Sequence, residues 1–280
     1  MARHIPSFAV PLALSVALSF PALAGAPGSV KSGADNRIPA GTYIMDPHAA
    51  ENTQTHARKM RELESRAQPH QEVTPTGSLT PVTLSMSGVD QKPCGGYCGQ
   101  ASTQEILHYK GQWSYSLDNI RYWETGLTSG CYDSTGTCLT PIRDTLNSYT
   151  PGLPWANFYE AYHLNHNSLY DAATDLQRIT QSDVSTYAMP LMALTNPNPP
   201  DGTPYCLPGW CGVNVDGHYL VINGYAGSYD GSDASAAIYY LDSYYNPGDQ
   251  HWANLNNFAD AIYYKNGSGS CSSSLDDIIW

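Results

Sequence analysis

The sequence predicts an α+β domain, because its helical patterns come first along the chain and its strand patterns come later. Amphipathic and helix-forming segments fall within residues 98–181, and short β-rich runs fall within residues 190–242. The strands and helices do not alternate as they would in a parallel α/β fold. The chain has 280 residues, of which 41% are hydrophobic and 14% charged. This length suffices for one domain of roughly 200 residues plus an extension.

Three segments have helical patterns. Residues 98–109 are amphipathic, with Ala101, Ile106 and Leu107 as candidate core residues. Gly111 follows the segment and is typical of the end of a helix. The other two predicted helices cover residues 139–149 and 172–181.

Three short runs are predicted to be strands, because apolar and β-branched residues in them are bounded by Gly, Pro, Asn and Asp. These runs are residues 190–194, 219–225 and 237–242. A further apolar run at residues 258–264 fits either a closing strand or a short helix. The expected sheet is therefore formed by the second half of the domain.

The first 24 residues have the pattern of a secretory signal peptide. Arg3 and His4 precede a mostly apolar run that ends in Ala22-Leu23-Ala24, a small-x-small sequence. A single-pass membrane anchor is the alternative, but three prolines within the run disfavour it. No other apolar stretch reaches about 18 residues. The mature protein is therefore expected to be secreted, into the extracellular space or the periplasm.

Residues 25–86 form a leader that is polar, rich in proline and poor in aromatic residues. Within it, residues 49–66 are helix-forming, but Met60 and Leu63 are their only large apolar residues. Such a segment cannot build a core alone. Two interpretations stay open: a flexible spacer, or a pro-segment whose helix docks on the domain and is later removed.

The charge separates the leader from the domain, which we place at residues 87–280. Residues 86–280 carry 6 Lys and Arg against 19 Asp and Glu, whereas residues 1–85 carry 7 basic and 6 acidic residues. The net charge of −12 argues against nucleic acid as a partner, because phosphate binding requires a cluster of basic residues. It also argues against binding to an anionic membrane surface.

The domain contains seven cysteines, and an oxidising compartment favours their pairing. An odd number leaves one thiol over, and we expect that thiol to be Cys98. Six cysteines allow 15 pairings. A zinc site is disfavoured, because the sequence has no Cys-x-x-Cys or His-x3-5-His pair. The expected pairs are Cys131–Cys138 and Cys206–Cys211, each around a short turn, and Cys94–Cys271.

Cys98 has the setting of a nucleophile. It opens the predicted helix at residues 98–109, and Gly95, Gly96 and Gly99 leave its sulfur accessible to a substrate. The N-terminus of a helix carries about half a positive charge and unsatisfied N–H groups, which favour the thiolate. A thiolate is the nucleophile needed for acyl transfer. The alternative is that Cys98 is half of a cystine.

His218 is the candidate general base, because it follows Gly217 and opens a predicted strand. From that position its imidazole can reach the N-terminus of a neighbouring helix and take the thiol proton. Asp242 ends the predicted strand at residues 237–242, and a hairpin would bring it beside His218 to orient the ring. Asn223 and Asn246 are the alternatives for this orienting role.

Acyl transfer also needs hydrogen-bond donors for the developing oxyanion. The backbone N–H of Cys98 is one candidate. The side-chain amide of Gln91, just upstream in the sequence, is the other.

Three sequence blocks together resemble papain-like cysteine peptidases. They are the glutamine and Cys-Gly-x-Ala-Ser helix start, the Gly-His-Tyr-Leu-Val-Ile-x-Gly-Tyr strand, and the Tyr-Tyr-Leu-Asp strand. The resemblance covers roughly residues 90–245 and is strongest to the branch of bacteriocin-exporting transporter peptidases. It implies an N-terminal helical lobe with Cys98 as nucleophile and a C-terminal antiparallel β lobe with His218 as base and Asp242 as orienting residue. It also implies Gln91 as oxyanion donor, although the family glutamine usually lies six positions before the nucleophile and Gln91 lies seven before.

The sequence therefore predicts a secreted cysteine peptidase that acts on a peptide or protein substrate as a monomer, without a cofactor or a metal ion. A transglutaminase-like transferase or an amidase could use the same Cys-His-Asp chemistry. A non-catalytic secreted binding module is the alternative from a different class, because tyrosine and asparagine are abundant.

Overall fold

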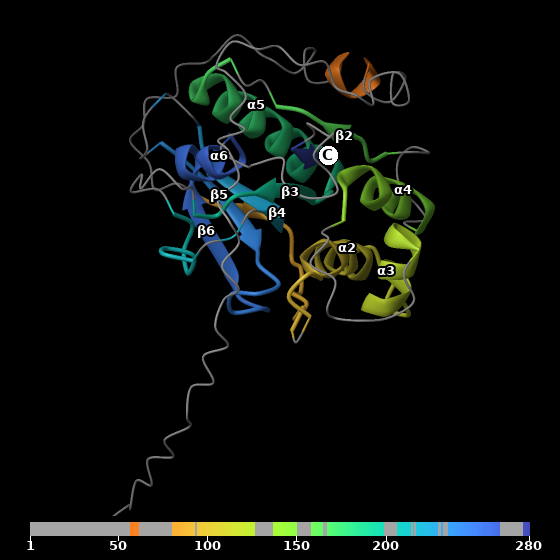
Figure 1. The fold of residues 1–280 in the computed structure, drawn as a ribbon. Coiled ribbons are helices and arrows are strands. Elements are labelled where there is room, and N and C mark those ends of the chain that lie inside the picture. Colours follow the sequence, from red (N-terminus) through yellow and green to blue (C-terminus); the bar gives the residue numbers. More distant parts are fainter. Residues whose placement is uncertain are drawn as a thin grey trace, which may run out of the picture. The chain divides into compact units, whose positions relative to one another are not determined.

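The computed structural model describes residues 57–61, 80–92, 94–126, 137–149, 158–164, 167–198, 206–213, 215, 217–228, 231, 235–263 and 277–280 (Figure 1). All of these residues belong to one compact unit, Asn36–Trp280. The predicted signal peptide lies outside the described residues, and the predicted leader is described only at its residues 57–61 and 80–86. In the described part of the chain, no helix is long and apolar enough to cross a membrane.

The fold is α+β, as the sequence predicts, with helices on both faces of an antiparallel sheet (Figure 1). Side chains alternate along the strands, so two separate hydrophobic clusters form, one on each face. In β3 (Leu191–Thr195), for example, Leu191 and Ala193 belong to one cluster and Met192 to the other. The first cluster includes α5 (Leu169–Ser182) and α6 (Leu255–Tyr263). The second includes α2 (Cys98–Tyr109), α3 (Leu117–Thr125) and α4 (Leu139–Tyr149).

The sheet is entirely antiparallel, with the strand order β2-β7-β3-β4-β5-β6. A seventh strand, β1, pairs with the far part of β4, beyond the residues that pair with β3. The remaining strands are β1 (Val82–Thr83), β2 (Ala161–Tyr162), β4 (His218–Gly227), β5 (Ala236–Leu241), β6 (Gln250–Asn254) and β7 (Ile278–Ile279).

Most of the predicted elements are present. The predicted helices at residues 98–109 and 139–149 are α2 and α4, and the third lies within the longer α5. The predicted strands correspond to β3, β4 and β5, each with ends within two residues of the prediction. In the ambiguous run at residues 258–264, residues 258–263 belong to a helix, α6, and residue 264 lies outside the described residues.

Local signals set the ends of two helices. The Ser116 hydroxyl accepts a hydrogen bond from the Asn119 N–H, which begins α3, and Gly126 ends it with φ +73°. The Ser168 side chain caps α5 in the same way. At its other end α5 continues into a π-helical turn, η1 (Asp183–Tyr187), so the Asp183 side chain lies at a change of helical pitch.

Glycine at position 224 allows β1 to approach β4 closely. A Cβ atom at Gly224 would lie 2.6 Å from the carbonyl oxygen of Val82 and 2.6 Å from the Thr83 side chain. The register between β4 and β5 also shifts at this point. Beyond β1 the chain continues to Gln91, whose N–H donates to the Ser243 carbonyl at 3.0 Å. The close pairing therefore directs the segment before α2 toward the end of β5.

Candidate active site

Cys98 is the first residue of α2 and is half-buried. Tyr97 occupies the N-cap position and provides no side-chain hydrogen bond to the helix. The N–H groups of the first turn are therefore not occupied by a capping side chain, and the positive end of the helix dipole lies at the sulfur. Among the described residues, Cys98 is the free cysteine.

The other described cysteines are all in disulfides. The predicted bond between Cys206 and Cys211 is present, with 5.1 Å between the Cα atoms. Cys94 and Cys138 are also disulfide-bonded. Their predicted partners, Cys271 and Cys131, lie outside the described residues. A disulfide is compatible with a protein exported to an oxidising compartment.

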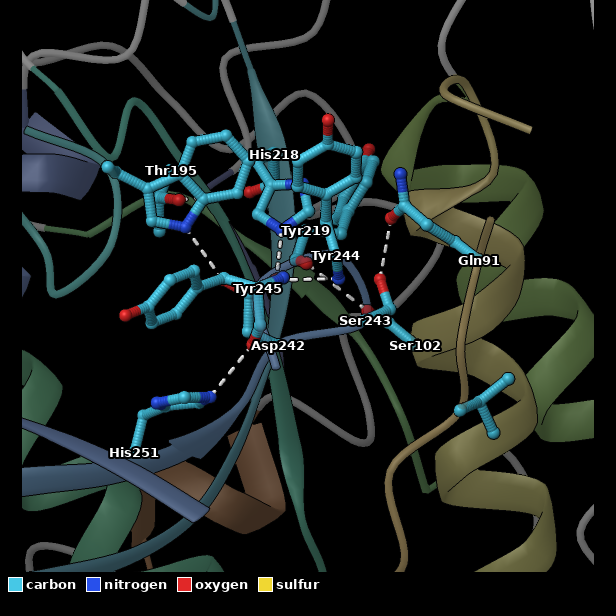
Figure 2. A network of polar contacts seen from close by, with 12 residues as sticks. Gln91, Ser102, Thr195, His218, Tyr219, Asp242, Ser243, Tyr244, Tyr245 and His251 are labelled. Carbon is cyan, nitrogen blue, oxygen red and sulfur yellow. Dashed lines mark hydrogen bonds and ion pairs between the residues drawn. The ribbon is translucent and has the colours of Figure 1, made fainter. Parts of the chain in front are cut away.

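His218 and Asp242 meet at the same end of two neighbouring strands. His218 opens β4, and Asp242 directly follows β5, which ends one residue earlier than predicted. The antiparallel pairing places their side chains together, and the His218 Nε2 lies 2.9 Å from the Asp242 Oδ1 (Figure 2). Both side chains are buried. This contact leaves Nδ1 as the ring nitrogen available to Cys98.

Cys98 and His218 lie close enough together for each to shift the pKa of the other. Burial raises the pKa of the Cys98 thiol, but His218 and the backbone groups of Tyr219 and Gly99 together outweigh burial, so the pKa lies below its ordinary value. Burial lowers the pKa of His218, but the bonds to Asp242 and Cys98 raise it to about 9. Both shifts favour a thiolate beside an imidazolium.

Asp242 accepts hydrogen bonds from four donors. Oδ1 accepts from His218 and from the N–H groups of Tyr244 and Tyr245, at 2.9 and 3.1 Å respectively. Oδ2 accepts from the Trp210 indole N–H at 2.7 Å. Burial raises the pKa of Asp242, but the bond to His218 and the other donors together lower it by a larger amount. The net shift of the pKa is therefore downward. The carboxylate is therefore fixed and ionised opposite His218.

Trp210 is a residue of this site that sequence analysis did not identify. Its indole donates to Asp242, and its ring centroid lies 4.6 Å from that of His218. The loop that carries it is closed by the Cys206–Cys211 disulfide. At Gly209, φ is +83° and a Cβ atom would lie 2.4 Å from the Tyr245 ring, so only glycine fits. In the sequence, the only indication was a tryptophan between two closely spaced cysteines, Cys206 and Cys211. The sequence did not indicate which residues the tryptophan would contact.

For any acyl-transfer reaction that uses Cys98 and His218, replacing Trp210 with phenylalanine is expected to lower kcat about tenfold, with little change in KM. The variant keeps the ring against His218 but removes one hydrogen bond to the charged Asp242 carboxylate. Steady-state kinetics on a fluorogenic peptide would measure the effect. The control is Trp113→Phe, because Trp113 is exposed and stacks on His108 away from the site. An equal loss in both variants would contradict this role for Trp210.

Gln91 is buried beside the loop that leads into α2. Its Nε2 donates to the Gly95 carbonyl at 3.2 Å, and its Oε1 accepts from the Ser243 hydroxyl at 2.7 Å. Figure 2 shows Gln91 and Ser243 joined in this way, directly next to Asp242. The structure thus brings all four candidate residues into one region, with Gln91 linked both to the Cys98 loop and to the Asp242 segment.

Two buried glutamates near the nucleophile were also missed by sequence analysis. Glu105 lies in α2 and accepts from the Val89 N–H at 2.9 Å, which holds the segment before Gln91 against the helix. Glu124 accepts from the side chains of Thr103 and Gln100 in α2, at 2.7 and 2.9 Å. Burial raises the pKa of each glutamate to about 8. Both therefore brace the Cys98 helix as largely neutral carboxylic acids at pH 7.

Asn223 and Asn246, the alternatives for orienting His218, have other roles in the structure. Asn223 donates to the Leu84 carbonyl and accepts from Gln250, each at 3.0 Å, and Asn246 occupies a turn with φ +46°. Among the other described histidines, His163 pairs with Asp277 at 3.0 Å and His251 contacts the Tyr245 carbonyl at 2.9 Å. Within the described ranges, no group of three or more His, Cys, Asp or Glu side chains is arranged to hold a metal ion.

No known protein-family model matches this chain, and no curated protein sequence matches it. The geometry of Cys98, His218 and Asp242 therefore carries the functional argument.

Proposed function

We propose that the protein is a secreted cysteine peptidase in which Cys98 is the nucleophile, His218 the general base and acid, and Asp242 the residue that orients His218. The observation that carries this proposal is that His218 interacts with both Cys98 and Asp242, and that Cys98 lies at the N-terminus of α2. A nucleophile, a base and an orienting acid in this order are the elements of a catalytic triad.

The reaction follows from these positions. The Cys98 thiolate attacks the carbonyl carbon of the scissile peptide bond, and the protonated His218 gives its proton to the leaving amine. The carbon–nitrogen bond breaks and a thioester to Cys98 remains. His218 then takes a proton from a water molecule, which attacks the thioester and releases the acid and the thiolate. Asp242 keeps the imidazole in place and stabilises its positive charge throughout.

Two donors are available for the oxyanion of the tetrahedral intermediate. The Cys98 backbone N–H lies in the uncapped first turn of α2. The Gln91 amide nitrogen carries two hydrogens, one of which bonds to the Gly95 carbonyl. The second hydrogen can donate to an oxyanion beside Cys98. In this proposal Gln91 is therefore the second oxyanion donor, despite its shifted spacing from the nucleophile.

The arrangement of elements supports a papain-like assignment. The nucleophile comes from the helical group α2, α3 and α4, and the base and acid come from neighbouring antiparallel strands, β4 and β5. The sequence resemblance implies helical and β lobes, and this origin of the three residues supports that interpretation. The Cys206–Cys211 disulfide supports secretion.

The test is mass spectrometry of the secreted full chain before and after treatment with an epoxide that alkylates cysteine peptidases. A single adduct on Cys98 is expected, because its thiolate is stabilised and the other cysteines are predicted to be paired. The Cys98→Ser variant is the control and should carry no adduct.

A peptide library of mixed sequence then distinguishes the remaining functions. Cleavage by the untreated protein, lost after treatment, would support the peptidase. Labelling of Cys98 without cleavage of any peptide would favour a transferase or an amidase instead. A folded protein with no adduct would contradict catalysis by Cys98 and favour a binding module.

A further inference from the structure

One lysine of the predicted leader is buried in the domain. Lys59 belongs to a helical segment at residues 57–61, and only 1% of its surface is exposed. Its Nζ lies 3.5 Å from the Asp183 Oδ2. The same nitrogen lies 4.0 Å from the Phe158 ring centroid and 4.4 Å from that of Trp280. A buried ammonium group therefore meets one carboxylate and two aromatic faces, and we call Asp183, Phe158 and Trp280 the lysine cage.

The lysine cage joins three parts of the chain that are distant in sequence. Asp183 lies where α5 passes into η1, Phe158 precedes β2, and Trp280 follows β7. Glu160 and Trp280 exchange backbone hydrogen bonds of 3.0 and 3.1 Å, which continue the pairing of β2 with β7. Lys59 thus contacts a residue that precedes β2, the residue that follows β7 and the first residue of η1.

Burial disfavours the charged forms of Lys59 and Asp183, and the contact between them offsets part of that cost. Burial lowers the pKa of Lys59, and the charges of Asp183 and Glu160 oppose part of that shift, while Arg58 adds to it. Burial raises the pKa of Asp183 to about 6, although Lys59 opposes the rise and Glu160 adds to it. Two aromatic faces add cation–π attraction to a desolvated ammonium group. Removing either charge leaves the other buried without compensation.

The lysine cage and the candidate active site lie at opposite ends of β3. Continuing the β3–β7 pairing places Trp280 opposite Leu191, the first residue of β3, whereas His218 pairs with Thr195, the last residue. Trp280 and His218 lie two strands apart in the sheet and are offset by four residues along the strand direction. Combined, these two offsets correspond to about 16 Å between the two residues. Lys59 therefore docks well away from the Cys98 sulfur.

We propose that the lysine cage is a docking site for the leader, occupied by residues 57–61 of the same chain, which clamps the β2–β7 edge of the sheet and leaves Cys98 accessible. Met60, which packs against the core cluster of α5 and α6, is the apolar part of the same contact. Residues 57–61 of the leader are then a structural clamp and not an inhibitor that occupies the active site. This inference does not depend on the proposed peptidase activity.

Acetylation of the folded full chain by an amine-reactive reagent tests the docking directly. Lys59 is expected to react at least tenfold more slowly than the exposed Lys92, and both should react at similar rates in urea. A lowered pKa makes a free amine more reactive, so slow acetylation of Lys59 reports its burial. Equal rates at Lys59 and Lys92 in the folded protein would overturn the proposal.

The Lys59→Ala variant tests the clamp. Its Tm is expected to fall by about 10 °C, because a buried ion pair loses one partner. Arg61→Ala, in the same short helix but exposed, is the matched control and should change Tm by no more than about 1 °C. If Lys59→Ala does not fold, Asp183→Asn provides the second test, with a lower Tm and faster acetylation of Lys59. An unchanged Tm in either folded variant would overturn the clamp.

The rate of Cys98 alkylation separates a clamp from an inhibitor. In Lys59→Ala and Asp183→Asn, measured well below Tm, this rate should remain within about twofold of the parent. A tenfold increase would mean that docking covers Cys98 and would overturn the proposal. None of these measurements requires hydrolysis of a substrate, so failure of the clamp and failure of the peptidase assignment give different results.

Discussion

Replacing His218 with alanine is expected to lower kcat/KM for peptide hydrolysis by at least about 10³-fold. The variant removes both the acceptor of the thiol proton and the donor to the leaving amine, which belong to the same residue in the proposed reaction. His108→Ala is the control, because His108 stacks on the exposed Trp113 and takes no part in the polar network. It should retain nearly all activity.

The same variant should change the pH dependence of Cys98 alkylation. In the parent, His218 lowers the Cys98 pKa and so increases the fraction of thiolate, and the imidazolium loses its proton as the pH rises through about 9. Without His218, the two largest causes that lower the Cys98 pKa are lost, so the pKa of the thiol rises. Alkylation at pH 6.5 should slow by at least about tenfold. A profile identical to that of the parent would show that His218 does not activate Cys98.

Replacing Asp242 with asparagine is expected to lower kcat by about 10²- to 10⁴-fold, with a smaller change in KM. Four donors converge on the carboxylate, and an amide offers one oxygen and an NH₂ group that cannot accept their hydrogens. The imidazolium also loses the negative charge that stabilises it. His218 would then be both less basic and less firmly oriented.

Steady-state kinetics and a thermal melt on the same preparation measure this effect. Asp249→Asn is the matched control, because Asp249 lies in the same segment after β5 but is exposed. Activity near that of the parent in folded Asp242→Asn would contradict the orienting role. A loss of activity that only follows a loss of folded protein would make Asp242 structural.

The sequence predicted the regular elements with strong periodic or apolar patterns. Residues 98–109 and 139–149 have helical spacing, and α2 and α4 match these ranges. Strand β4 follows from the apolar run at residues 219–222, directly after His218. Short elements gave no such signal: β7 has two residues, and α3 has a capping Asn119 in place of the Glu or Gln of the usual capping box.

The residues of the candidate site could be predicted from the sequence where they lie at the start or end of a helix or strand. Cys98 at a helix start and His218 at a strand start are local features, and the hairpin between β4 and β5 brings Asp242 to His218. Trp210 and Lys59 were not predictable, because each acts through contacts that depend on tertiary structure. A tryptophan in a loop or a lysine in a polar leader can occupy many different environments in a protein. Their contact partners are seen only in the folded structure.

The position of β7 has a consequence for how the protein folds. Strand β7 lies between β2 and β3, although it follows β6 and α6 in the chain. In the described part of the sheet, β2 pairs with no other strand. The edge of β3 and the whole of β2 can therefore pair only after residues 277–280 have been synthesised. These pairings close long loops and are expected to form late. A chain stalled before these residues exposes two unpaired strand edges, which are sites for aggregation.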